Sequence, residues 1–257
     1  GASSEMNYDQ DFDAWSIGAN YALTEDIALF FNYSDGGALA APDRVTGNLN
    51  PDGSMDNGAG FAEITQAEIG VKWQFGNGSL YATYFDAETD EERAFEVTTG
   101  QFRQDSFASS GFEFEGDYDF GNGFAIQGSL TLTDSEITST GDGTNIGNVP
   151  RRQADYIFNL TPSYSAGNWD VGLNFYGTDE VYAQNDNEAK FDAYTVANLF
   201  VNWYVNDNFS VSLNANNLFD EDGVTEGEEG NPAAGDLVRI RTINGQTTSL
   251  TLRYDFF

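Results

Sequence analysis

Polar and apolar residues alternate through long stretches of this sequence, which restricts it to β-structure. In WDVGLNF, from Trp169 to Phe175, the odd-numbered positions are apolar and the even-numbered positions are Asp, Gly and Asn. The runs that begin at Thr65, Phe124 and Thr248 alternate in the same way. A period of two places successive side chains on opposite faces of a strand. The sequence therefore predicts an all-β protein whose strands each have one apolar and one polar face.

Two kinds of connection separate these runs. Short turns rich in Gly, Asn and Asp, residues that tolerate the backbone of tight hairpins, occur at 24–26, 76–78, 121–123, 166–168 and 206–208. Longer polar segments, rich in Gly and Asp, lie between successive hairpins at 35–62, 87–104, 139–150, 184–190 and 220–242. Tight turns are therefore expected at one end of the sheet and long loops at the other.

The runs define eleven strands that are longer than the average strand of a soluble sheet. Their expected ranges are 11–22, 27–34, 63–75, 79–92, 105–120, 124–138, 151–165, 169–183, 191–205, 209–219 and 243–257. A strand that crosses a membrane at a tilt needs about nine to eleven residues. The lengths thus fit an antiparallel transmembrane β-barrel, and no segment shows a helical pattern.

The placement of charge favours a membrane over a soluble alternative, an acidic β-sandwich, which would also alternate. A Lys or Arg on the lipid face near the bilayer midplane costs about 2–4 kcal/mol. Lys72 and Arg253, the basic residues well inside strands, fall on polar faces. Aromatic residues gather near the tight turns, as in an interfacial girdle; they are Trp15, Tyr21, Trp73, Phe75, Phe120, Tyr164, Trp169, Trp203 and Tyr254.

Composition excludes several function classes. The 257 residues include 42 acidic and 10 basic residues, a net charge of −32, which argues against binding of nucleic acid. The chain has no histidine and no cysteine, so it lacks the commonest proton shuttle and the thiolate nucleophile. We therefore expect no enzymatic activity and no cofactor.

Near the end of the chain, the motif NANNLFDED follows an alternating strand that begins at Phe209. It resembles a signature near the C-terminus of TonB-dependent outer-membrane receptors, and the preceding hairpin, in VPRRQADYIFNLTPSYSAGNWDVGLNFYG, resembles theirs too. The resemblance covers 149–257 well and 1–148 in general character. It implies a receptor of the bacterial outer membrane that imports a siderophore, cobalamin or an oligosaccharide. The implied partners are outer-membrane lipid, the barrel-assembly machinery, TonB, a plug domain and an extracellular small-molecule or oligosaccharide ligand.

The resemblance also assigns expectations to individual residues. In the signature, Asn216 and Asn217 leave the strand at its rim, Leu218 and Phe219 form a last apolar anchor, and Asp220 enters water; a structural role is expected for all five. The final strand resembles the element that barrel-assembly machinery reads, through Leu250, Leu252, Tyr254, Phe256 and Phe257.

The strand count bears on the extent of the barrel. Complete bacterial barrels have an even number of strands, whereas the chain supplies eleven. We therefore expect residues 1–257 to form the C-terminal half of a larger barrel, which the resemblance implies has about 22 strands. No plug-like segment and no TonB box are recognised in the sequence.

Three further sets of residues are candidates for sites. Arg151 and Arg152 at the extracellular rim, with Phe200 and Tyr204 on a polar strand face, are candidate contacts for a ligand in the bore. Asp220, Glu221 and Asp222 are a candidate Ca²⁺ site, although a strict calcium-loop pattern is missing. A passive pore and an adhesive or scaffolding barrel stay open as alternatives to transport.

Overall fold

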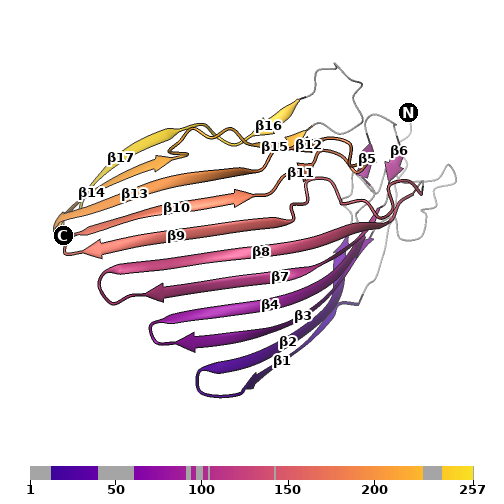
Figure 1. The fold of residues 1–257 in the computed structure, drawn as a ribbon, viewed down its shortest axis with the longest axis horizontal. Helices are drawn as coiled ribbons and strands as arrows, with labels where there is room; N and C mark the ends of the chain where they lie inside the picture. The colour runs from indigo at the N-terminus through magenta and orange to yellow at the C-terminus, as the bar shows by residue number, and fades with distance from the viewer. Residues whose placement is uncertain are drawn as a thin grey trace, which may run out of the picture.

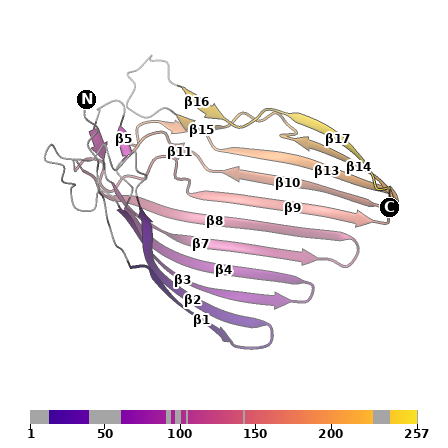
Figure 2. The same cartoon turned by 180° about the vertical axis from the view of Figure 1, so that it is seen from behind.

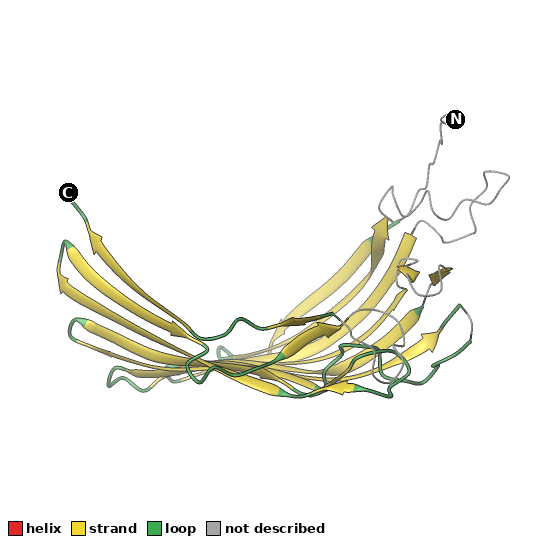
Figure 3. Cartoon of the chain, turned by 90° about the horizontal axis from the view of Figure 1, so that it is seen from above, coloured by secondary structure: helices red, strands yellow, loops and turns green. Residues whose placement is uncertain are grey.

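The computed structural model describes residues 13–39, 61–90, 94–96, 101–103, 105–141, 143–227 and 239–256. Eleven antiparallel strands form one curved wall in which each strand pairs with its neighbours in the chain order (Figures 1 and 3). The strands are β1 (Trp15–Ala22), β2 (Ile27–Leu39), β3 (Phe61–Phe75), β4 (Gly78–Asp90), β7 (Ser106–Asp119), β8 (Phe124–Ser139), β9 (Tyr156–Ala166), β10 (Trp169–Thr178), β13 (Tyr194–Asn206), β14 (Phe209–Asn216) and β17 (Thr247–Tyr254).

The predicted all-β, antiparallel, eleven-stranded architecture is therefore confirmed, and the sandwich alternative is wrong. The other sheets among the described residues are three two-stranded hairpins at the long-loop end (Figure 1). They pair β5 (Ala94–Glu96) with β6 (Gln101–Arg103), β11 (Val181–Tyr182) with β12 (Lys190–Phe191), and β15 (Val224–Gly227) with β16 (Ile240–Thr242). None of the three was expected from the sequence. Within the described ranges, no helix has the length and hydropathy that crossing a membrane requires.

Strand register sorts the alternating side chains onto two faces. Between β10 and β13, Val171 lies opposite Val201 and Leu173 opposite Leu199, whereas Asn174 lies opposite Asn198. Polar pairs recur on the same side of other strands, as at Asn32 with Glu68 and at Asp117 with Gln127, so most of the wall has one mainly polar face. The sorting weakens toward the long loops, where Asp86 and Asp134 continue the apolar rows of β4 and β8. In a closed barrel the polar face lines the bore and the apolar face meets lipid.

Hydrogen bonds between side chains tie the polar face together across strands. Asn174 Nδ2 donates to Thr161 Oγ1 of β9 at 2.8 Å and to Asn159 Oδ1 at 3.1 Å, while Asn198 Nδ2 of β13 donates to Asn174 Oδ1 at 3.3 Å. Amide side chains suit this role because each carries both a donor and an acceptor. Lys72 and Arg253 lie on this face, as predicted.

Aromatic rings on the apolar face form a band near the tight turns. Phe75 stacks with Tyr118 at 5.9 Å between centroids, Tyr118 meets Phe120 edge-on at 4.8 Å, and Phe120 lies 5.2 Å from Phe124. Trp169 and Trp203 stack at 5.2 Å with their planes 3° apart. The predicted girdle is present at this end of the wall.

Trp15 departs from the expected girdle. It pairs with Asp35, at the end of β1 remote from the turn at 24–26, and its ring lies 5.2 Å from that of Tyr33. The prediction that Trp15 belongs to the girdle is therefore wrong, because Ala22, and not Trp15, is the residue of β1 next to the tight turn. Trp15 belongs to the long-loop side of the wall.

Several strand boundaries differ from those expected. The strand predicted over 151–165 begins only at Tyr156, since Arg152 has a left-handed backbone with φ of 64°. The strand predicted over 209–219 ends at Asn216, because Asn217 has φ of 48°. By contrast, β2 continues through Gly37 to Leu39 by pairing with the start of β3. Residues 11 and 12, the expected start of the first strand, lie outside the described ranges.

Fully buried side chains lie mainly at the long-loop end of the wall. Ile137, near the end of β8, is 0% exposed and Val196, near the start of β13, is 1% exposed; Ala154 is 3% exposed. Loop main chain covers Ile137, whose amide donates to Asn148 O and whose carbonyl accepts from Gly147 N. The long connections therefore pack onto the wall.

Candidate functional site at the long-loop rim

Loops that are distant in sequence meet at the long-loop end of β8 to β17 (Figures 1 and 2). We call the segments 143–155, 179–193, 217–227 and 239–246 the rim platform. Two asparagines join its first two segments: Asn185 Oδ1 accepts from Arg151 N at 2.9 Å, and Asn187 Oδ1 accepts from Val149 N at 2.9 Å. Asn187 Nδ2 also donates to Val149 O at 2.8 Å. Asn187 adopts φ of 58°, a conformation that Asn tolerates better than most residues.

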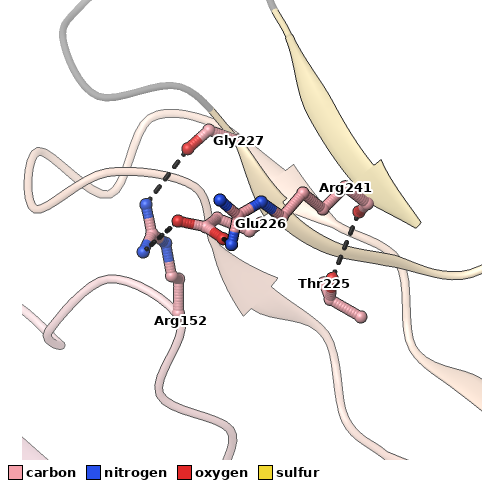
Figure 4. A network of polar contacts seen from close by, with 5 residues as sticks. All are labelled: Arg152, Thr225, Glu226, Gly227 and Arg241. Carbon is pink, nitrogen blue, oxygen red and sulfur yellow. Dashed lines mark hydrogen bonds and ion pairs between the residues drawn. The ribbon is translucent and has the colours of Figure 1, made fainter. Parts of the chain in front are cut away.

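Arg152 links the first segment of the rim platform to the β15–β16 hairpin (Figure 4). Its Nη1 lies 3.0 Å from Glu226 Oε1, and its Nη2 donates to Gly227 O at 3.0 Å. Arg241 Nη1 contacts the other oxygen, Glu226 Oε2, at 2.9 Å. One carboxylate thus bridges two guanidinium groups.

The two arginines around Glu226 have different surroundings. The Arg152 side chain is 27% exposed and its buried Nε makes no hydrogen bond within the described residues, whereas the Arg241 side chain is 80% exposed. Thr225 Oγ1 donates to Arg241 O at 3.2 Å and helps to close the hairpin. Arg152 therefore anchors the hairpin, and Arg241 presents its charge to solvent.

A pocket of about 380 Å³ adjoins this pair of salt bridges. Its lining is Glu226, Gly227, Arg239, Ile240 and Arg241. In a chain with 42 acidic and 10 basic residues, this is a concentration of positive charge at the rim. Guanidinium groups bind carboxylates and phosphates through paired hydrogen bonds. The arrangement can hold an anionic group in place of, or beside, the Glu226 carboxylate.

Lys190 forms a second charged contact on the rim platform. Its Nζ donates to Glu180 Oε1 at 2.5 Å and lies 4.5 Å from the centre of the Tyr182 ring. The hydrogen bond to Glu180 raises the pKa of Lys190 above the ordinary lysine value of 10.5. The charged lysine is thus favoured, and it closes the β11–β12 hairpin.

The signature after β14 forms a compact group of hydrogen bonds around Asn217, which we call the knot. This residue is 3% exposed, and its side chain donates to Glu221 O at 2.8 Å and to Asn244 O at 3.0 Å while accepting from Glu221 N at 2.8 Å. Its main-chain amide donates to Asn198 Oδ1 at 2.9 Å. The knot joins the end of β14 to both the wall and the segment before β17, which favours the structural role predicted for the signature.

The other residues of the signature occupy distinct places. Asn216 is exposed and donates to Thr247 at 3.3 Å; Leu218 N donates to Ala197 O at 2.7 Å; Phe219 is 74% exposed. Asp220 has φ of 54°, and its Oδ1 accepts from Gln246 N at 2.8 Å.

The candidate Ca²⁺ site does not assemble from these contacts. The main chain of Glu221 and the carboxylate of Asp220 are engaged in the knot, and Asp222 is exposed. Across the ranges that the structure describes, no three side chains of the types that bind metals converge.

Phe200 and Tyr204 lie on the polar face, as predicted, but far from the rim platform. The ring of Phe200 lies against Gly172 of the neighbouring strand, where glycine leaves room for it. Tyr204 is close to the tight turn at 206–208, and its amide donates to Asn168 O at 2.8 Å. Their contact with a ligand stays a prediction, as it does for Arg151 and Arg152.

The final strand matches its expected pattern as far as the structure describes it. Leu250, Leu252 and Tyr254 share the apolar face and are exposed, and the rings of Tyr254 and Phe256 meet edge-on at 4.9 Å. Phe257 lies outside the described residues. Recognition by the assembly machinery stays a prediction.

Sequence reasoning missed Glu226, Arg241, Asn185 and Asn187 as parts of one site. Asn185-Asp-Asn carries a weak signal, because Asn favours loops with left-handed backbone. The pairing of Arg152 with Glu226 spans a long stretch of chain and leaves no local pattern.

The family model described as TonB dependent receptor-like, beta-barrel, matches residues 2–218. The chain belongs to the TonB-dependent receptor β-barrel family. The resemblance read from the C-terminal motifs is therefore confirmed. Receptors of this family are bacterial outer-membrane proteins, transporters and receptors rather than enzymes.

Relatives extend well beyond the length of this chain. Over the whole chain, the pesticin receptor of Yersinia enterocolitica is 23% identical across 266 residues, and the pesticin receptor of Yersinia pestis is 23% identical across 269 residues. The chain spans 38% of the length of each.

Solved structures of the family share the fold. The ferric yersiniabactin uptake receptor FyuA of Yersinia pestis matches 94% of the chain with 37% of its own, at a TM-score of 0.74 and 18% identity. The ferric citrate transporter FecA matches 94% of the chain with 38% of its own length, at a TM-score of 0.76 and 15% identity. The copper transporter OprC matches 94% of the chain with 39% of its own length, at a TM-score of 0.74 and 15% identity. At these identities the likeness concerns the fold alone.

Proposed function

We propose that the chain is the C-terminal part of the barrel of an outer-membrane receptor that imports a scarce nutrient with the help of TonB. Other strands of the longer protein would pair with the edges of β1 and β17, and a plug would fill the bore. Family membership and the open eleven-stranded wall support this reading. The nutrient classes it covers are siderophores, cobalamin and oligosaccharides.

The rim platform supports a ligand-binding role for the long-loop end. Its loops are fixed to one another by Asn185, Asn187 and Arg152, so contacts within the chain hold the hairpin that lines the pocket beside Glu226. Fixed loops reduce the entropy lost when a ligand binds. The arginine-rich pocket favours an anionic ferric chelate as the first candidate. A receptor for a ferric chelate, the ferric yersiniabactin uptake receptor, is among the structural neighbours.

An uptake assay tests the proposal. The complete gene is expressed in a strain that lacks its own siderophore, cobalamin and oligosaccharide receptors, with and without TonB. We expect TonB-dependent accumulation of one nutrient class. Accumulation that continues without TonB would support the alternative of a passive pore, and no accumulation of any class by the folded protein would overturn the proposal.

A pair of variants then tests the rim pocket. Arg241→Gln removes the exposed guanidinium at the pocket, and it should weaken binding of the anionic nutrient at least about tenfold, the loss of one charge-assisted contact of 1.4 kcal/mol or more. Arg253→Gln, at the opposite end of the wall, serves as the matched control and should leave affinity unchanged. Equal affinity for both variants and the parent protein would remove the pocket from the proposal.

A further inference from the structure

A groove of about 480 Å³ interrupts the apolar face of the wall. It lies over β4, β7, β8 and β9, and its walls are mainly apolar side chains, among them Leu80, Phe114, Tyr118, Ile126, Leu130 and Leu160. The volume falls within the range of about 300–1,000 Å³ that is usual for small-molecule sites. This part of the wall takes no part in the rim platform.

The groove exists because two glycines face each other across neighbouring strands. Gly116 of β7 pairs with Gly128 of β8, and the same cross-strand row continues to Leu80 on one side and Leu160 on the other. All four residues point to the apolar face, because they alternate with Glu115, Asp117, Gln127 and Ser129 of the polar face. Two missing side chains in one row leave a trough bounded by the two leucines.

Two glycines of the polar face, Gly70 and Gly172, are covered by aromatic rings instead. The ring of Phe30 lies over Gly70, and the ring of Phe200 lies over Gly172. At Gly116 and Gly128, by contrast, the nearest side-chain atoms to an added Cβ are Leu80 Cδ1 at 3.4 Å and Leu160 Cδ1 at 3.2 Å. The leucines border the paired glycines without covering them as a ring does.

The residues at one end of the groove indicate where it lies relative to the membrane. Phe75 and Tyr118 line it, and their stacked rings belong to the aromatic band near the tight turns. Aromatic bands lie at the boundary between hydrocarbon and headgroups. The groove therefore starts at this boundary and extends into the hydrocarbon layer, continuous with the apolar face that meets lipid.

We propose that this groove holds one acyl chain of a phospholipid from the leaflet next to the tight turns. The proposal rests on the membrane placement within the proposed function, but not on nutrient uptake. An open apolar trough suits a flexible hydrocarbon chain, which fills it by dispersion contacts along its length. The hydroxyl of Tyr118 at the headgroup end gives the lipid a polar neighbour.

Photocrosslinking tests the site in the protein expressed from its complete gene. The protein is reconstituted into nanodiscs of phosphatidylethanolamine that contain a fraction of the same lipid with a diazirine near the middle of one acyl chain. After irradiation, lipid adducts are mapped by mass spectrometry. We expect adducts in 112–130 to exceed those in 209–216, on the apolar face of β14, severalfold.

Two matched variants sharpen this test. Ile126→Trp fills the groove and should reduce the adducts in 112–130 to the level seen on β14; Leu213→Trp adds the same ring to the apolar face of β14 and should leave them unchanged. Uniform adducts over all apolar faces of the parent protein would overturn the proposal, without reference to either variant. A second copy of the chain seated on the groove would shield it from lipid, so fewer adducts in 112–130 than in 209–216 would also overturn the proposal. Nutrient uptake provides an independent readout, so a failure of the proposed transport is distinguishable.

Discussion

Replacing Asn217 with alanine removes the centre of the knot that closes the β14 end of the rim platform. The side chain is 3% exposed and makes three hydrogen bonds, two to carbonyl oxygens and one from the amide of Glu221. Each such bond contributes about 1 kcal/mol net. The left-handed backbone at φ of 48° costs alanine roughly 1 kcal/mol more than asparagine. We therefore expect Asn217→Ala to lower the free energy of local opening by about 3–4 kcal/mol.

Hydrogen exchange measures this opening directly in the protein expressed from its complete gene. Because every 1.4 kcal/mol is a factor of ten, the amides of Glu221 and Gln246 should exchange roughly 100- to 1,000-fold faster in Asn217→Ala. Asn216→Ala is the matched control, since Asn216 is exposed and its single bond to Thr247 is 3.3 Å long. That variant should change exchange by less than about tenfold. Unchanged protection in Asn217→Ala, or equal effects of the two variants, would refute the structural role assigned to the signature.

Three further predictions concern the wall and its loops. Leu213→Arg puts a cation on the apolar face and should cost about 2–4 kcal/mol of folding free energy in bilayers, whereas Asn214→Arg on the polar face should cost little. Urea titration of the reconstituted protein compares the two variants. Equal costs would contradict the assignment of faces. Gly111→Ala should sharply lower the yield of folded protein, because an added Cβ collides with Leu132 O of β8. Gly36→Ala should fold normally, since its added Cβ meets only Ala14 Cβ at 3.5 Å. The yields are compared on heat-modifiable gels, and equal yields would count against the strand register. Glu180→Gln should speed acylation of Lys190 at mildly alkaline pH, because losing the carboxylate charge weakens the contact, lowers the pKa of Lys190 and exposes more neutral amine. Mass spectrometry measures the rate, and an unchanged rate would argue against the contact.

The sign of the Lys190 effect follows from the direction of its shift. The pKa is raised in the folded protein, so the contact with Glu180 contributes fully below the ordinary lysine value of 10.5 and is lost as the pH rises through the raised value. Between neutral pH and that value, this lysine stays charged and the β11–β12 contact persists.

The wall was predictable from sequence because its determinants are local. Alternation fixed the faces of residues such as Leu173 and Asn174, and the Gly and Asn turns fixed the pairing of each strand with the next. A slip of one residue would exchange the two faces, so the register is strongly specified. The eleven strands and their order followed from these two signals.

The rim platform was not predictable in the same way. The contact between Arg152 and Glu226 joins two loops that are far apart in sequence. Neither loop has a periodic pattern of polar and apolar residues from which the contact could be predicted. The early end of β14 depends on a single left-handed residue, Asn217, whose conformation is set by Asn198, Glu221 and Asn244. Positions held by non-local hydrogen bonds carry no pattern that sequence alone can reveal.

Site-directed spin labelling along β13 tests most directly whether successive side chains of the wall face lipid and water in turn. The chain has no cysteine, so each residue from 198 to 203 can carry one label in an otherwise unchanged segment. In bilayers, labels at Leu199, Val201 and Trp203 should collide mainly with dissolved oxygen, and labels at Asn198, Phe200 and Asn202 mainly with a water-soluble nickel chelate. A period of two in this ratio is the predicted result. Equal protection of both sets from the chelate, as in a shared dry interior, would contradict the account.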